Sequence, residues 1–175
     1  MEQVKFRAKF GGVFDVECFD KHGNLKWQER AHNIITNEGL DHILDTELHG
    51  ATAITAWYCA LVETDTTAAA TQTYATPIYT ESTSYDETQR PAYDEAAASS
   101  QVITNSANKA AFTISDTKTM YGAALVGGGS AALTKADAAG GGTLLCYAKF
   151  TSSRAVVDDD VINLTYSISA ADDAA

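Results

Sequence analysis

Alternating apolar and polar residues dominate the first part of the chain. Over residues 4–10 every second position is apolar and the intervening positions are basic, which is the two-residue period of a strand. The alternation resumes after Gly11 and Gly12 and continues to Phe19. The pattern therefore predicts a long or broken strand from Val4 to Phe19, in which the glycine pair permits a bulge or bend.

A turn and a second strand follow this first block. Residues 20–24 read Asp-Lys-His-Gly-Asn, a turn composition in which Gly and Asn tolerate positive φ angles. A second strand is predicted from Leu25 to about Ile35. The two strands predict a β-hairpin, and we expect residues 3–35 to form an N-terminal hairpin arm.

The apolar period changes after residue 36. Apolar residues then recur at three- and four-residue spacing on one helical face, namely Leu40, Ile43, Leu44 and Leu48. Thr36 or Asn37 can serve as the N-cap, and Glu38 lies near the positive end of the helix dipole. Gly50 is a plausible stop. The sequence predicts one short α-helix over residues 37–48.

The remaining regular segments predict strands. Trp57–Val62 is a continuous apolar run, which indicates a central strand buried on both faces. Shorter alternating runs cover residues 101–105, 110–115, 119–126, 143–150 and 161–169. Seven or more strands and one helix predict a mainly β fold, either a β-sandwich or a jelly-roll-like domain. A length of 175 residues fits a single domain over residues 1–175.

Two long segments lack a regular pattern. Residues 63–98 contain seven carboxylates and the single basic residue Arg90, and we expect an acidic loop excursion over the surface with short edge strands. The glycine-rich connection over residues 127–142 is expected to be a flexible loop or an ordered excursion held by a partner.

The charge balance excludes several classes of partner. Twelve lysines and arginines stand against 23 aspartates and glutamates, so the formal net charge is -11. An acidic chain is repelled by phosphate backbones and anionic lipid, so we expect no binding to nucleic acid or to a membrane. The N-terminus lacks a signal-peptide block, and we expect synthesis in a cytoplasm.

The sequence contains no recognisable catalytic motif, and we expect neither an enzyme nor a cofactor. Cys18, Cys59 and Cys146 are far apart, which favours three buried thiols over a metal site. The run Asp158–Asp160 favours a solvated turn over a calcium site, because three adjacent carboxylates point in different directions.

Two sets of residues are candidates for binding. The first is a basic strand face that can dock on an acidic copy or another protein, with Lys5, Phe6, Arg7, Lys9 and Phe10 as candidate interface residues. An ordinary edge strand protected by lysine is the alternative. The second set offers rings that can stack on sugars or pack the acidic loop onto the domain: Tyr74, Tyr79, Tyr85 and Tyr93.

Several segments, taken in order, resemble a family of small virion structural proteins of tailed bacteriophages. The resemblance is carried by residues 14–27, 32–40, 56–62, 85–93, 105–112 and 144–146. It implies a phage structural protein that stabilises the outer capsid surface as a decoration, cement or minor capsid protein. The implied partners are the major capsid protein and copies of itself, in a homo-oligomer.

Two other functions stay open on the sequence. The first is a tail, baseplate or fibre component. The second is a module that recognises a glycan or a protein on the host surface.

Overall fold

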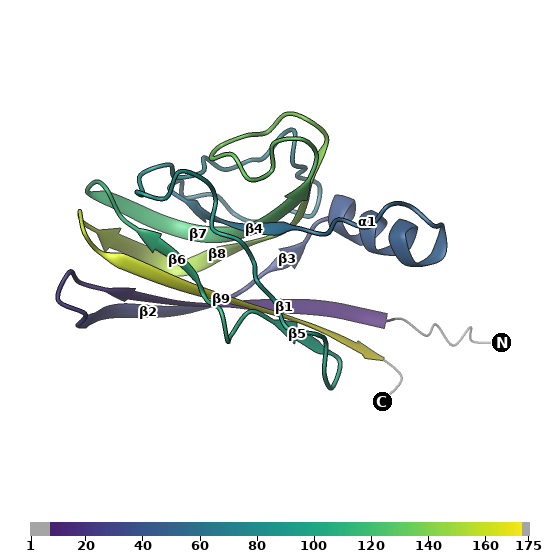
Figure 1. Ribbon diagram of the computed structural model, residues 1–175, viewed down its shortest axis with the longest axis horizontal. Helices are drawn as coiled ribbons and strands as arrows, with labels where there is room; N and C mark the ends of the chain where they lie inside the picture. The colour runs from purple at the N-terminus through teal and green to yellow at the C-terminus, as the bar shows by residue number, and fades with distance from the viewer. Residues whose placement is uncertain (1–7, 173–175) are drawn as a thin grey trace.

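Two antiparallel sheets pack face to face, and one helix lies at one end of them (Figure 1). The computed structural model describes residues 8–172. The first sheet has the order β2-β1-β9-β5, and β6 also pairs with β9. Its strands are β1 Ala8–Phe19, β2 Leu25–His32, β5 Val102–Thr104, β6 Ala110–Thr113 and β9 Val161–Asp172. The second sheet has the order β3-β8-β7-β4, with β3 Ile34–Ile35, β4 Trp57–Val62, β7 Lys118–Gly128 and β8 Gly142–Val156.

The main core fills the space between the two sheets. Alternate residues of each strand point inward because successive side chains lie on opposite faces. Large side chains of this core that are almost completely buried are Phe14, Phe112, Tyr166, Leu61, Met120 and Leu125. The predicted mainly β fold with one short helix is confirmed, and its architecture is that of a β-sandwich.

Strand β1 is unbroken, which corrects the expectation of a bulge or bend at its glycine pair. Its register with β9 runs without a shift from Ala8–Asp172 to Phe19–Val161. Gly12 is instead required by side-chain packing, because a Cβ atom there would lie 2.4 Å from the Tyr166 hydroxyl. The glycine therefore allows close packing against a side chain from the neighbouring strand.

The predicted hairpin exists, but it is not a projecting arm. The Asp20 carboxylate accepts from the backbone N–H groups of His22 and Asn24, and Gly23 has a φ of 80°. Strand β1 lies between β2 and β9, so the hairpin is part of the sheet. The second predicted strand is also divided at Asn33, since β2 belongs to the first sheet and β3 to the second.

The second sheet is covered on both faces, as predicted for Trp57–Val62. Cys59 and Leu61 point into the core between the sheets, whereas Ala60 and Val62 point to the opposite face. The first part of the segment 63–98 covers that outer face together with residues 129–141, since Tyr74, Tyr79 and Ala132 belong to a second apolar cluster there. Tyr85 and Tyr93, farther along the segment, instead join the core between the sheets. The acidic excursion is therefore ordered, and its first part forms an outer layer over the second sheet.

Candidate assembly surface

Helix α1 (Asn37–Leu48) has the predicted bounds, and its first turn is fixed tightly to the second sheet. The Thr36 hydroxyl caps the helix by accepting from the Gly39 N–H at 2.9 Å. Gly39 rests directly on β8, because a Cβ atom there would lie 2.6 Å from the Leu145 carbonyl oxygen. The helix can approach the sheet this closely only because position 39 has no side chain.

Glu38 ties the start of α1 to two other segments. Its carboxylate accepts from the backbone N–H of Leu144 at 2.7 Å and from that of Tyr74 at 2.9 Å. Leu144 belongs to β8, and Tyr74 belongs to the outer loop layer. One side chain therefore joins the helix, the sheet and the loop.

Replacing Glu38 by alanine is expected to lower the free energy of unfolding by about 1–2 kcal/mol, because two backbone donors lose their acceptor. Urea denaturation measures the change. Asp41→Ala in the same helix is the matched control and is expected to stay within about 0.5 kcal/mol of the wild type, since Asp41 is exposed. Equal losses in the two variants would contradict this role of Glu38.

The packed face of α1 is not the leucine-rich one. Gly39, Ile43 and the half-buried His42 turn toward the sandwich, and the His42 ring meets Trp57 edge-on at 5.7 Å. Leu40, Leu44 and Leu48 have exposed fractions of 36%, 52% and 82%. Of the four apolar residues expected on one helical face, only Ile43 packs against the core.

Acidic residues flank the exposed leucines. Asp41, Asp45 and Glu47 are exposed, and none of them forms an ion pair within residues 8–172. Acids near the C-terminal end of a helix interact unfavourably with its dipole. The last turn of α1 contains no basic residue that would offset this. We call the exposed side formed by Leu40, Asp41, Leu44, Asp45 and Leu48 the leucine face.

The start of β1 lies at the same end of the molecule as α1 (Figure 1). Residues 8–12 pair with the end of β9 on one side, whereas pairing with β2 begins only at Val13. Lys9 and Phe10 of the predicted interface are both exposed here. The other three candidates, Lys5, Phe6 and Arg7, lie outside the described residues.

Lys9 forms no ion pair with any carboxylate within residues 8–172. Elsewhere in residues 8–172, every lysine and arginine except Lys21 pairs with a carboxylate or donates to a carbonyl oxygen. Lys9 and the acids of the leucine face therefore carry charges that nothing else in residues 8–172 neutralises.

A second charged site lies between the two long loops. Its arginine, Arg90, is bound by groups of the same chain. A cavity of about 230 Å³ there is lined by Tyr74, Glu81, Arg90 and Asp137, among others. Arg90 forms a buried ion pair with Glu81 at 2.5 Å and donates to the carbonyl oxygens of Ala132 and Asp137. This arginine holds the glycine-rich loop, which is thus fixed by its own chain.

The tyrosines of the acidic loop are buried. Tyr74, Tyr79, Tyr85 and Tyr93 have exposed fractions of 3%, 9%, 2% and 6%. Rings that are this deeply buried cannot present a flat surface to a sugar. The alternative expectation, that they pack the loop onto the domain, is confirmed.

The three cysteines are free and buried, as predicted. Burial raises the pKa of Cys18 and of Cys146 to about 12 and also raises the pKa of Cys59. Within residues 8–172 no cluster of histidine, cysteine and acidic side chains is arranged to hold a metal ion. In the Asp158–Asp160 turn, Asp160 is buried and pairs with Lys26, so only part of the turn is solvated.

These thiols are expected to resist a thiol-specific reagent in the folded protein, both at about pH 8 and at about pH 10. A free cysteine reacts faster over this range because its thiolate fraction rises, whereas thiols with a raised pKa stay protonated. All three should react at once in denaturant. Rapid labelling of the native protein at about pH 10 would show that a thiol is accessible.

No helix within residues 8–172 is long and apolar enough to cross a membrane.

A family model described as Podophage GP4 fiber I protein gp80 matches residues 30–169. The match begins near the end of β2 and ends within β9, so it contains α1 and both long loops. The N-terminal basic block lies outside it. No curated protein matches the chain.

Proposed function

The chain belongs to the family described as Podophage GP4 fiber I protein gp80, and from this premise we propose that it is a structural subunit of a virion fibre in a tailed bacteriophage. The observation that carries the proposal is the family match over residues 30–169, which takes in most of the sandwich. The chain is thus a phage structural protein and a virion component, in line with the resemblance noted in its sequence.

The family description favours a fibre over the capsid surface. The resemblance noted in the sequence implied a capsid decoration protein that contacts the major capsid protein. The family match supports a phage structural protein in general but gives no specific support to a place on the capsid. We propose copies of the same chain as its partners in the fibre. The capsid surface remains the competing placement.

We propose that this role involves no catalysis. The charged side chains in the interior support this view, since Arg90 is paired with Glu81, Arg154 with Glu29, and Lys26 with Asp160. The Arg154–Glu29 and Lys26–Asp160 pairs join segments that are distant in the sequence, and Arg90 links the acidic loop to the glycine-rich loop through the carbonyl oxygens of Ala132 and Asp137. A stiff domain with an acidic surface suits a repeated unit that must keep its shape in an assembly.

Immunogold labelling of purified virions tests the placement. An antibody raised against the folded protein is expected to mark discrete projections. Virions from a phage in which the reading frame is deleted serve as the control and should remain unlabelled. Gold particles spread evenly over the capsid would favour the decoration role, and unlabelled wild-type virions would contradict both.

A further inference from the structure

The leucine face of α1 has the composition of a binding surface, because apolar and acidic side chains lie side by side on it and are exposed. Leu44 and Leu48 are more than half exposed although they stand in a helix whose other side packs on the core. Asp41 and Asp45 lie on the adjoining stripe and have no ion-pair partner within residues 8–172. A partner for this face must offer apolar side chains and positive charge together.

We propose that the leucine face binds the N-terminal segment, residues 1–7, of a second copy of this chain. The segment has the matching chemistry, because Val4 and Phe6 are apolar and alternate with the basic Lys5 and Arg7. The chain has only 12 basic residues, and most of those in residues 8–172 are paired. Three of the twelve basic residues, Lys5, Arg7 and Lys9, lie within five positions of the sequence, so the N-terminal block is the chain's densest cluster of positive charge to complement the acids of α1.

The spacing of the two surfaces also agrees. Alternate residues of an extended segment recur about every 6.6 Å. Residues four apart in a helix, such as Leu40, Leu44 and Leu48, recur about every 6 Å. A segment lying along α1 therefore brings Val4 and Phe6 against two successive leucines. Lys5 and Arg7 are then on its opposite face, and their long side chains bend around the segment to the flanking aspartates.

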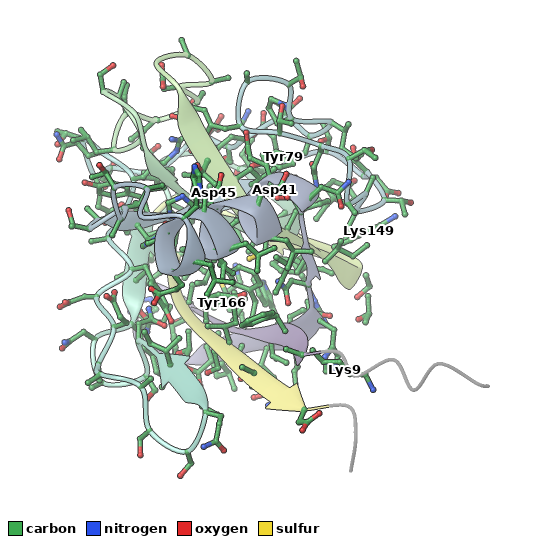
Figure 2. The ribbon with its side chains drawn as sticks, turned by 90° about the vertical axis from the view of Figure 1, so that its right-hand side faces the viewer. Lys9, Asp41, Asp45, Tyr79, Lys149 and Tyr166 are labelled. Atoms are coloured by element: carbon green, nitrogen blue, oxygen red, sulfur yellow. The ribbon has the colours of Figure 1, made fainter. Side chains whose placement is uncertain are left out.

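The arrangement at this end of the molecule favours a second copy over the chain's own N-terminal segment. Figure 2 views this end directly, with Asp41 and Asp45 on the upper side of α1 and Lys9 well below it at the start of β1. Strand β1 thus begins below the helix, on the side opposite the labelled acids. Asp41 and Asp45 are exposed, so a neighbouring copy can reach them.

This contact deepens the proposed fibre role by naming a partner surface, and it rests on that role for its place in the virion. Exposed charge pairs contribute little individually, and the leucines offer only a short apolar stripe. A repeated assembly needs no more than this, because linked copies gain from avidity. The contact is therefore expected to be weak between isolated chains.

Sedimentation of the purified full chain tests the contact by charge reversal. The wild type is expected to self-associate at concentrations up to about 1 mM. Asp41→Lys with Asp45→Lys should weaken this association about tenfold, and Lys5→Asp with Arg7→Asp should do the same. Combining all four substitutions should restore it, because each pair is then reversed. Lys21→Asp and Leu25→Ser, at the far hairpin, are controls that should leave it unchanged.

A mixing experiment separates a second copy from the chain's own segment. The chain lacking residues 2–7 retains only the leucine face, and the Asp41→Lys, Asp45→Lys chain retains only the N-terminal segment. Each alone is expected to associate far more weakly than the wild type, but an equimolar mixture should form a one-to-one complex at the concentrations where the wild type associates. Circular dichroism confirms that both variants are folded.

Three results would overturn the inference: a wild type that stays monomeric throughout, charge-reversed chains that associate unchanged, or a mixture that remains monomeric. None of them bears on the fibre placement, which immunogold labelling tests separately. Labelled projections together with a monomeric chain would leave the fibre role intact and remove this contact. Self-association through the leucine face together with unlabelled virions would support this contact and contradict the fibre role.

Discussion

Replacing Arg90 by methionine is expected to lower the free energy of unfolding by about 3–5 kcal/mol, which is the usual cost of removing one partner from a buried ion pair. Arg90 and Glu81 have exposed side-chain fractions of 2% and 7%, so the remaining carboxylate stays buried without its counter-charge. The carbonyl oxygens of Ala132 and Asp137 also lose their donor. Urea denaturation measures the stability, and limited proteolysis should show new cleavage within residues 129–141.

Arg30→Met provides the matched control for Arg90→Met. Arg30 pairs with Asp15 at 3.0 Å, but the two side chains have exposed fractions of 67% and 43%. Solvent screens this pair, so the loss is expected to be no more than about 1 kcal/mol. If both arginine variants lost the same stability, or if Arg90→Met left the glycine-rich loop protected, Arg90 would not be what fixes the loops.

Replacing Gly39 by alanine is expected to destabilise the protein by up to about 3 kcal/mol, although alanine is the better helix former by roughly 1 kcal/mol. The added Cβ atom would lie 2.6 Å from the Leu145 carbonyl oxygen and 2.9 Å from the Leu145 Cα atom. Both are backbone atoms of a central strand and cannot turn aside. The helix must therefore move, and the leucine face moves with it.

Gly11→Ala is the control for the Gly39 variant. A Cβ atom at Gly11 meets nothing within 4 Å, so this change is expected to leave thermal stability nearly unchanged. The Gly39 variant should also self-associate more weakly than the wild type. Wild-type stability in the Gly39 variant would mean that α1 does not rest on β8 as the structure has it.

The elements defined by local signals could be predicted from the sequence. The period of three and four residues after Thr36, together with its capping side chain, places α1 at its observed bounds. The apolar run Trp57–Val62 likewise indicates a strand covered on both faces, as found. Such signals depend only on neighbours in the chain, so a sequence displays them directly.

Features that depend on distant contacts could not be predicted in the same way. Gly12 is explained by the Tyr166 ring, which reaches it from β9, and the passage from β2 to β3 depends on the separation of two sheets. The exposure of the leucines was not predicted, because a helical period says which residues share a face but not which face is covered. Among these long-range contacts, only that of Arg90 was indicated by the sequence, where it is the one basic residue in the acidic segment 63–98.

The sequence indicated one side of the proposed contact. The basic character of the first ten residues predicted a docking strand; Lys9 and Phe10 of this strand are exposed, and the interface stays a prediction. Their proposed counterpart on α1 could not be predicted, because the acids and leucines there also fit an ordinary amphipathic helix. The structure shows which side of the helix is covered: His42 and Ile43 pack against the sandwich, and the leucines are exposed.

The most direct test of the fibre role is the number of copies of this protein per purified virion, measured by quantitative mass spectrometry against the major capsid protein. A fibre subunit should be present at a small fraction of the major capsid protein, because fibres are few. Near-equal copy numbers would instead place the protein on the capsid surface and contradict the fibre role. Its absence from virions would contradict a structural role of either kind.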